Sequence, residues 1–288
     1  MSGAQSDLRW SNERRLEFLE FKLFWDGGVN RGDLISHFGV SVPQASKDLT
    51  QYQELHPNNT VYDKHKKRYV PTAAFTPAYL KPDPVGFLTR LAGQEAVGGE
   101  SGPVLPVYAM PVPRRPIDAS ALRVIVEAVR EKASVEILYQ SMSAERPEPI
   151  WRRISPHAFG FDGFRWHVRA WCHISSSFKD FIISRIMGTR DLQPSLFDGA
   201  DDSCWRKLVD VKLIPNPRLS PAQQSVIARD YDMRDGAATL RVRQAFLYYF
   251  NRHMGLDKPA DDGDPRGTPV VVANRQAYDA ALKQLGTR

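Results

Sequence analysis

Apolar positions near the amino terminus recur at helical spacing in two successive segments. Residues 7–26 carry a dense set of leucine, phenylalanine and tryptophan side chains among arginine and glutamate, which predicts a well-buried helix. Gly27 and Gly28 follow and end this helix. Residues 31–38 repeat the helical spacing, and Gly39 supplies the left-handed residue that ends a second helix. The chain therefore opens with two helices joined by a short turn.

A third helix is predicted over residues 42–55, directly after a tight turn. Ser41 at its N-cap and Gln44 three residues later match a capping box, in which the two residues satisfy each other's backbone donors. Two short β-branched and aromatic segments follow, at residues 60–63 and 68–71, and they predict a β-hairpin. Three helices and a hairpin in this order indicate a winged helix-turn-helix.

A change in composition ends this first region. Residues 84–91 predict one more helix, and residues 92–116 are rich in glycine and proline, which opposes regular structure. We therefore place a first domain at residues 1–95 and a linker at residues 96–117.

The middle region begins with an amphipathic helix after Asp118 and then changes to strand periodicity. Short strands with tight turns over about seventy residues predict a small β-barrel that closes its own edges. The domain covers residues 118–200. Its strands are predicted at residues 134–140, 151–155, 164–172 and 178–186.

The last region, residues 201–288, mixes strands and helices and has α/β character. Its strands are predicted at residues 209–214, 238–242 and 269–273, and its helices at residues 221–230, at residues 244–254 and at the carboxyl end. The whole chain is therefore expected to be a multidomain α+β protein.

Composition narrows the function classes. Hydrophobic residues make up 42% and charged residues 25%, and no apolar run approaches the roughly 20 residues that a membrane span needs. No secretory signal precedes the first helix, so the expected location is the cytoplasm. Cys172 and Cys204 are too few for a disulfide framework or a multi-cysteine zinc site, and the seven histidines show no metal spacing. Neither a cofactor nor a metal is expected, and no catalytic constellation indicates an enzyme.

The net charge of +6 favours a polyanionic partner, and its distribution is informative. Basic side chains crowd at the hairpin tip with Asp63 alone opposing them, while the early positions of the third helix offer an amide, hydroxyls and small apolar groups suited to base edges. The alternative is a three-helix bundle with an ordinary polar face. The predicted DNA contacts are Ser41, Val42, Gln44, Ala45, Ser46, Lys47, Lys64, His65, Lys66, Lys67 and Arg68.

Two strands of the middle region carry a family resemblance. Residues 164–172, with Trp166-His167-Val168 in the place of Trp-Tyr-Leu, and residues 181–186, with Phe-x-x-x-Arg-Ile spacing, resemble the core of the WYL domain. Tyr139 and Pro156-His157 also fall where that family has them. The order of the three regions is similar to that of the bacterial WYL transcriptional regulators of the BrxR and CapW type, which are found beside phage-defence systems.

This resemblance implies an Sm-like or SH3-like five-stranded barrel that binds an effector, either nucleic acid or a nucleotide. It also implies a homodimer that represses a neighbouring operon. The effector-site residues carried over by resemblance are Tyr139, Ser141, His157, His167, Arg169 and Arg185.

Strand alternation is consistent with such a site. It places Arg165, His167, Arg169 and Trp171 on one face of their strand and brings Arg185 onto the same face as Phe181 on the next strand. A guanidinium suits phosphate, and an aromatic ring suits base stacking. The alternative is that these arginines only form solvated strand faces.

The sequence thus predicts a dimeric repressor that binds a double-stranded operator with an inverted repeat. The carboxyl-terminal region, with its apolar helix at residues 246–250, is expected to hold the two subunits together, although this helix could equally be core. The competing hypothesis is an RNA or single-stranded nucleic-acid binding module without promoter specificity.

Overall fold

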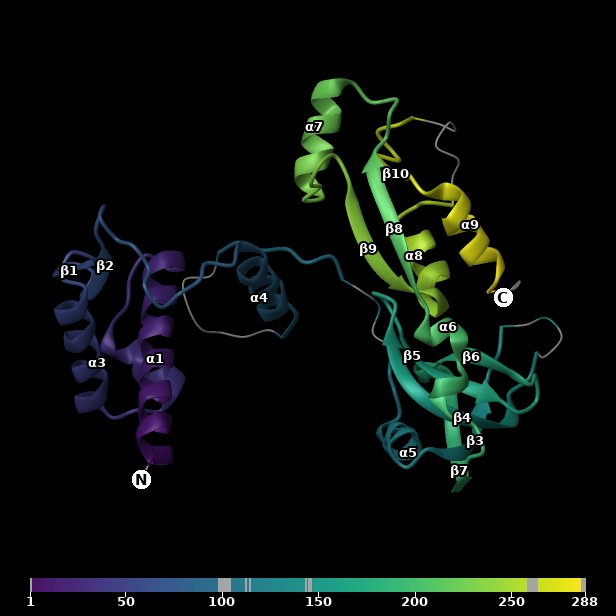
Figure 1. Cartoon of the computed structure of the whole chain (residues 1–288). Coiled ribbons are helices and arrows are strands. Elements are labelled where there is room, and N and C mark those ends of the chain that lie inside the picture. The colour runs from purple at the N-terminus through teal and green to yellow at the C-terminus, as the bar shows by residue number, and fades with distance from the viewer. Residues whose placement is uncertain are drawn as a thin grey trace. The chain divides into compact units, whose positions relative to one another are not determined.

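The computed structural model describes residues 2–97, 105–111, 113, 115–142, 144, 147–257 and 264–285, with only the helical backbone described for residues 2–10 and 94–97. The chain divides into two compact units, Met1–Pro111 and Val112–Arg288, which are treated separately below (Figure 1). Among the helices described, none combines the length and the apolar character that a membrane crossing requires.

The first unit is a three-helix core with a hairpin and a further helix. It contains α1 (Ser2–Trp25), α2 (Arg31–Phe38), α3 (Val42–Leu55), the antiparallel strands β1 (Thr60–Asp63) and β2 (Arg68–Pro71), and α4 (Pro84–Val97). The second and third helices and both strands confirm the prediction from the sequence. The first helix begins earlier than expected, and α4 runs six residues beyond the predicted end at residue 91, into the expected linker.

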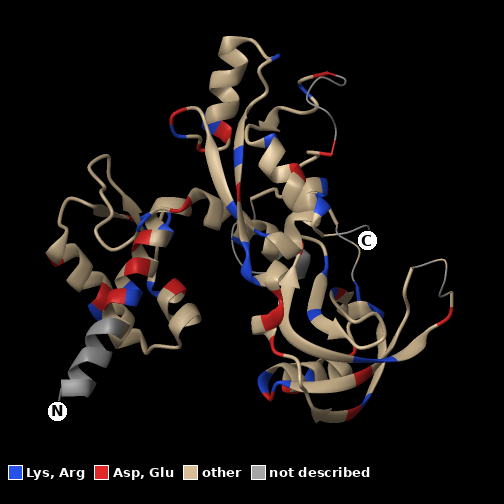
Figure 2. Cartoon of the chain, turned by 45° about the vertical axis from the view of Figure 1, so that its right-hand side comes forward, with Lys and Arg blue, Asp and Glu red and all other residues tan. Residues whose placement is uncertain are grey.

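Leucines of α1 form the centre of this unit. Leu16, Leu19 and Leu23 are buried against residues of α2 and α3, including Leu34 and Leu49. Burial of each such side chain contributes about 1.5–3 kcal/mol. Figure 2 shows acidic and basic residues interspersed along α1, so this helix carries mixed charge.

A buried carboxylate fixes the segment that follows the hairpin. Glu20 is fully buried on α1, and its carboxylate accepts hydrogen bonds from the backbone N–H groups of Ala78, Tyr79 and Leu80 at 2.7–2.8 Å and from the hydroxyl of Tyr52 at 3.0 Å. Burial and the nearby carboxylate of Glu20 raise the pKa of Tyr52 well above its usual value. Since a buried charge is tolerated only when it is hydrogen-bonded, this cluster positions the chain that leads to α4.

Helix caps differ in detail from the prediction. Ser41 caps α3 by accepting from the backbone N–H of Gln44 at 3.3 Å, but the side chain of Gln44 donates to Asp48 instead of returning to Ser41. The capping box expected at Ser41 is therefore only half formed. A complete capping box occurs one helix earlier, between Asn30 and Asp33, and Gly39 ends α2 in the predicted left-handed conformation with φ of 66°.

The second unit begins with α5 (Ala119–Arg130) and an antiparallel five-stranded sheet. The strand order is β6-β5-β4-β3-β7, and α5 covers one face, where Ile125 and Ala128 pack on Ile137, Ile154 and Val168 (Figure 1). The strands are β3 (Ala133–Tyr139), β4 (Ile150–Phe161), β5 (Trp166–Cys172), β6 (Ser177–Ile182) and β7 (Ile186–Pro194).

Two expectations for this sheet are corrected. Within the described residues β6 and β7 remain unpaired edges, so the sheet is open and the closed barrel is not confirmed. The strand predicted at residues 178–186 is broken by the 3-10 turn η1 (Ile183–Arg185), which separates β6 from β7. Strict alternation therefore does not extend from Phe181 to Arg185.

The carboxyl-terminal part of the second unit is α/β, as predicted, with a three-stranded antiparallel sheet of order β10-β8-β9. The predicted apolar segment at residues 246–250 spans the end of η3 and the start of α8, and Leu247 is fully buried in the local core. The elements are η2 (Gly199–Asp201), α6 (Ser203–Arg206), β8 (Leu208–Pro215), α7 (Pro221–Asp230), β9 (Ala238–Arg243), η3 (Gln244–Phe246), α8 (Leu247–His253), β10 (Val270–Val272) and α9 (Arg275–Lys283).

Candidate functional site

The start of α3 presents most of the residues predicted to contact DNA. Ser41, Val42 and Lys47 are exposed, Val42 to 54%, and Ser46 is half-buried. Ala45 has 0% exposure because it packs in the core beneath the helix, so the prediction that it meets a base edge is wrong. The accessible part of the helix is therefore narrower than the sequence indicated.

Gln44 is held in place by a buried ion pair. Its amide nitrogen donates to Asp48 Oδ1 at 2.8 Å, and Arg15 on α1 donates to the same carboxylate through Nε at 2.7 Å. Asp48 is 1% exposed, so this pair also fixes α3 against α1. The side-chain carbonyl oxygen of Gln44 is the atom left to accept a hydrogen bond from a base.

Sequence reasoning missed one position on the same face. Thr50 is exposed and follows Pro43 and Lys47 at one-turn spacing along α3. The helical period of the sequence could have identified Thr50, because residues three and four apart lie on one face of a helix. Thr50 and Lys47 extend the accessible surface of α3 beyond its first turn.

The hairpin tip is ordered by a single aspartate. Asp63 Oδ1 accepts from the backbone N–H groups of His65 at 2.9 Å and Lys66 at 3.0 Å, and Lys67 takes a left-handed conformation with φ of 50°. Lys64, His65, Lys66 and Lys67 are all exposed. The tip therefore presents a compact group of cations to solvent.

Arg68 does not belong to this group. It is half-buried, and its guanidinium donates to the backbone carbonyl of Gly28 in the turn between α1 and α2. A Cβ at Gly28 would lie 2.7 Å from the carbonyl oxygen of Tyr69, which explains the glycine at this close approach. Arg68 thus joins the hairpin to the helices, and its predicted contact with DNA is not supported.

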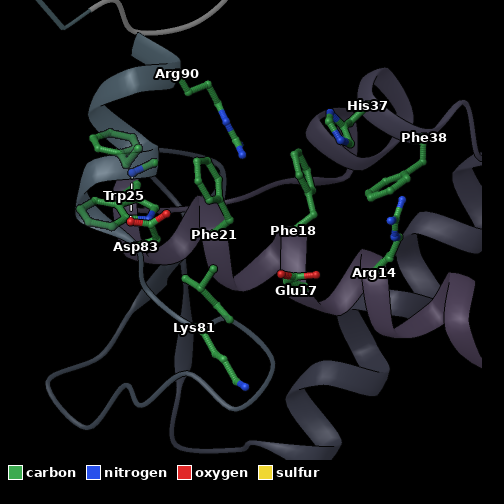
Figure 3. A pocket seen from close by; sticks show the side chains of 13 residues that line it. Arg14, Glu17, Phe18, Phe21, Trp25, His37, Phe38, Lys81, Asp83 and Arg90 are labelled. Atoms are coloured by element: carbon green, nitrogen blue, oxygen red, sulfur yellow. Dashed lines mark hydrogen bonds between the residues drawn. The ribbon is translucent and has the colours of Figure 1, made fainter. Parts of the chain in front are cut away.

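A groove of about 420 Å³ lies between α1, the end of α2 and α4 (Figure 3). Its rings are packed on one another: Trp25 stacks on Phe87 with centroids 4.3 Å apart, and the guanidinium of Arg90 lies 4.8 Å from the ring centre of Phe21. Acidic Glu17 and Asp83 offset its basic residues. We assign these contacts a structural role, since they attach α4 to α1.

In the second unit, the predicted polar face of β5 is covered. Val168 and Ala170 face the core, and His167 and Arg169 on the other face are also buried, Arg169 to 4% exposure. The cover comes from the carboxyl-terminal part, where Phe246 and Tyr249 lie against the His167 ring and Asp202 pairs with Arg169. The expectation of an open cationic face on β5 is therefore wrong.

Arg169 is fully engaged by carboxylates. It donates to Asp202 through Nε at 2.6 Å and Nη2 at 3.2 Å, and to Asp180 through Nη1 at 3.0 Å. Burial alone would raise the pKa of Asp202, but the hydrogen bonds from His157 and Arg169 outweigh it and hold that pKa well below its usual range. Arg169 is thus a structural cation here, in contrast to its predicted role as an effector contact.

Each of the two histidines predicted to bind an effector is paired with a buried aspartate. His157 Nε2 lies 3.1 Å from Asp202 Oδ2, and His167 Nε2 lies 2.8 Å from Asp162 Oδ2. His167 is also enclosed by Phe246 and Tyr249, with ring centroids 5.9 and 4.8 Å away. Both histidines therefore stabilise the contact between the sheet and the carboxyl-terminal part, and both are largely buried, with side-chain exposures of 11% for His157 and 1% for His167.

The remaining predicted effector residues lie at another end of the sheet. Tyr139 is buried, and its hydroxyl accepts from the backbone N–H of Ile182 at 3.2 Å. Ser141 follows in the chain, and the backbone carbonyl of Arg185 accepts from Gln140 N at 3.4 Å. Arg185 is half-buried, and its guanidinium has no hydrogen-bond partner among the described residues. Tyr139, Ser141 and Arg185 are therefore brought together, apart from His157, His167 and Arg169.

Sequence reasoning missed Arg152 at this same end. Arg152 lies on β4, and its guanidinium carbon is 5.3 Å from the centre of the Tyr139 ring. The alternation of residues along the strand could not single out Arg152, because its neighbour Arg153 is also an arginine and the sequence does not show which of the two is buried. Over the described part of the chain, no cluster of three or more histidine, cysteine or acidic side chains is arranged to hold a metal ion.

Comparison with known protein families gives three matches in chain order. Residues 11–93 match the BrxR transcriptional regulator winged helix-turn-helix domain, and residues 120–190 match the WYL domain. Residues 208–278 match the BrxR transcriptional regulator C-terminal dimerization domain.

Curated relatives are similar over nearly the whole chain. The DNA-binding transcriptional repressor CapW of Stenotrophomonas maltophilia is 38% identical over 98% of this chain and 96% of its own. CapW of Escherichia coli strain KTE188 is 38% identical over 96% and 93%, and CapW of Pseudomonas aeruginosa is 37% identical over 95% and 93%.

Proposed function

Because this chain belongs to the BrxR and CapW family of WYL-domain transcriptional regulators, we propose that it represses transcription by binding an operator through its first unit. The observation that carries this proposal is the pairing of an accessible α3 with a cationic hairpin tip in one domain. The function lies in regulation and not in catalysis, in agreement with relatives that are transcriptional repressors.

In this proposal α3 enters the major groove. Gln44, Lys47 and Thr50 lie toward base edges and adjacent phosphates, because an α-helix fits the major groove and its early residues meet the bases. Lys66 and Lys67 at the hairpin tip contact the phosphate backbone, which supplies affinity without sequence information.

We further assign dimerisation to the carboxyl-terminal region. The helix α7 has no buried residue among the described part of the chain, and its Val226 is 59% exposed. Leu240 on edge strand β9 is 41% exposed, and Figure 1 shows α7 along the β9 side of the sheet. An exposed apolar surface beside an edge strand supports an interface between two copies. A two-fold dimer would recognise an inverted repeat with half-site centres about 10 base pairs apart or a multiple of this.

The finer assignment follows the domain boundaries predicted from the sequence. Residues 1–95 bind DNA, residues 96–117 form a linker, residues 118–200 sense a nucleic-acid or nucleotide effector, and residues 201–288 dimerise. The regulated genes are proposed to form a phage-defence operon, because the regulators that this chain resembles are found beside phage-defence systems. A search for an inverted repeat upstream of such genes tests this part.

One binding experiment separates the proposal from its alternative. Fluorescence anisotropy of the full chain with duplex promoter DNA, an unrelated duplex and the separated strands should show tightest binding to the promoter duplex. Specific operators are commonly bound 10³–10⁷ times more tightly than unrelated DNA. Equal or tighter binding to single strands would instead support a single-stranded nucleic-acid binding module.

A further inference from the structure

Three aromatic side chains lie exposed at one end of the β4–β5 hairpin. Phe161, Phe164 and Trp166 are 51%, 50% and 50% exposed. Phe161 pairs with Trp166 across the two strands, and the centroids of their rings are 5.0 Å apart. Single exposed apolar residues are ordinary on a protein surface, but a group of large ones marks an interaction site. We call these three residues the hairpin aromatic surface.

The turn that carries the hairpin aromatic surface is held by several contacts. Asp162 Oδ1 accepts hydrogen bonds from the backbone N–H groups of Phe164 at 2.8 Å and Arg165 at 2.7 Å, and Asp162 Oδ2 lies 2.8 Å from His167 Nε2. The ring of Phe164 also stacks on His253, with centroids 4.6 Å apart. Because these contacts already hold the turn in place, the binding of a ligand loses little entropy in ordering it.

A small cavity of about 140 Å³ lies between the hairpin aromatic surface and the segment that leads into α5, and Pro113 and Trp166 line it from the two sides. Arg115 of this segment reaches across, since its Nη1 donates to the backbone carbonyl of Phe164 at 3.4 Å. Ile117, two residues further on, packs against the core of the five-stranded sheet. The segment is therefore already seated against one side of the surface.

The sequence of this segment favours the polyproline II conformation. Five of the residues from 103 to 116 are prolines, and two pairs of them, Pro103 with Pro106 and Pro113 with Pro116, are one polyproline II turn of three residues apart. The described residues between α4 and α5 form neither helix nor strand, and Asp118 has φ of −66° and ψ of 121°, close to polyproline II values. Grooves lined by aromatic rings are the usual surfaces that bind such segments.

We propose that Phe164 and Trp166 form a docking site for a polyproline II segment, and that residues 113–117 of the same chain occupy it as a strap. This segment is favoured over a separate proline-rich peptide because Ile117 anchors it beside the surface, which gives it an effective concentration on the order of 1 mM. The last part of the predicted linker, residues 96–117, is then attached to the sheet. The strap depends neither on operator binding nor on an effector.

Binding of the same segment as a free peptide tests the site on the full chain. Pro113→Gly combined with Arg115→Ala removes contacts of the strap and leaves Ile117 in the core. A fluorescein-labelled peptide of residues 103–117 should bind this double variant about tenfold more tightly than the parent, because the parent's own segment competes for the site. Fluorescence anisotropy measures both affinities. A control peptide in which alanine replaces every proline should not bind.

Two tryptophan substitutions, each added to the double variant, show whether the peptide uses the proposed site. Trp166→Ala should abolish peptide binding. Trp151→Ala is the matched control and should leave it unchanged, because Trp151 is 37% exposed on the same sheet but lies outside the cavity, with its ring centre 3.9 Å from the guanidinium carbon of Arg190. In the chain with an intact strap, Trp166→Ala should speed trypsin cleavage before Arg115 about tenfold, because cleavage follows the population of the released segment.

Several results would overturn the strap. If the double variant does not bind the peptide, or binds the control peptide equally, the hairpin aromatic surface is not a polyproline II site. Equal affinity of the parent and the double variant would mean that residues 113–117 do not occupy the site, and unchanged trypsin cleavage in Trp166→Ala would mean the same. Equal loss of binding in Trp151→Ala and Trp166→Ala would place the peptide elsewhere.

A second substitution covers the case in which Trp166→Ala does not fold, as judged by circular dichroism. Phe164→Ala removes the other ring beside the cavity and should also weaken peptide binding to the double variant. Unchanged peptide affinity after that substitution contradicts the site.

Discussion

Arg169 on β5 forms a two-point hydrogen bond to Asp202, with Nε to Oδ2 at 2.6 Å and Nη2 to Oδ1 at 3.2 Å. The two residues are 33 positions apart, and both are buried. Asp202 Oδ2 also lies within hydrogen-bond distance of His157 Nε2. The same carboxylate caps α6 by accepting a hydrogen bond from the backbone N–H of Trp205 at 3.1 Å. This one carboxylate therefore attaches the carboxyl-terminal part of the second unit to the five-stranded sheet.

We expect Asp202→Asn to destabilise the second unit on the order of 3 kcal/mol, because it leaves the buried Arg169 only partly paired. Urea unfolding followed by fluorescence measures the loss. The matched control is Asp198→Asn, whose exposed partner is Lys132 and which should change stability little. Equal effects of the two substitutions would show that Asp202 does not join the two parts.

Stability should also fall in acid through the same residue. The pKa of Asp202 is lowered in the folded state, so its stabilising contribution is complete above the unfolded aspartate pKa of about 3.9 and is lost as the pH falls through the lower folded value. Urea midpoints measured from pH 7 to pH 2 should decline below about pH 4. Asp202→Asn should make this decline shallower, and an identical acid profile would contradict the assignment.

DNA binding should respond differently to changes in α3 and in the hairpin tip. Gln44→Ala should reduce discrimination at one base pair by about 1 kcal/mol, because it removes the one side-chain oxygen that is left to accept a hydrogen bond from a base. Lys66→Ala combined with Lys67→Ala should weaken binding to every sequence and reduce the slope of log affinity against log salt by about two. Anisotropy titrations at several salt concentrations measure both effects.

Lys81→Ala is the control for those variants, since Lys81 lines the groove between α1 and α4 and not the proposed DNA surface. It should bind operator as the parent does. Unchanged affinity and salt dependence in the double lysine variant, together with unchanged base preference in Gln44→Ala, would exclude the proposed interface.

Dimerisation should depend on the exposed apolar surface of α7 and β9. Val226→Asp combined with Leu240→Asp should halve the mass measured by light scattering and leave the fold intact, because both side chains are exposed in the single chain. Leu192→Asp changes an exposed leucine of β7 and should leave the dimer unaffected. A double variant that remains dimeric would refute this interface.

Arg185→Ala should leave folding and basal repression intact while it abolishes the response of a reporter promoter to infection or DNA damage. The reason is that Arg185 lies at a partly exposed turn and makes no side-chain hydrogen bond among the residues described. Arg123→Ala, on the exposed side of α5, is the control and should respond as the parent does. If Arg185→Ala responds as the parent does, Arg185 does not take part in sensing, and the five-stranded sheet has a structural role only.

Local signals in the sequence are sufficient to predict the elements of the first unit and the family of the chain. Apolar spacing located α2 and α3, β-branched runs located β1 and β2, and Gly39 marked the end of α2, since each of these signals acts between residues close in the chain. Motif spacing around Trp166 and Arg185 also predicts the WYL domain, which the family comparison confirms over residues 120–190. The accessible residues of α3 could have been extended to Thr50 by the same helical period.

The availability of charged residues to a ligand depends on contacts between segments that are far apart in the chain. Strand alternation correctly predicts that His167 and Arg169 share a face, but it carries no information on whether a segment 33 residues away covers that face with Asp202. Likewise Arg152 and Arg153 are equivalent in the sequence, yet one is enclosed without a partner and the other is paired with Glu136 and Asp191. Burial and pairing depend on contacts between distant segments, and local periodicity cannot specify them.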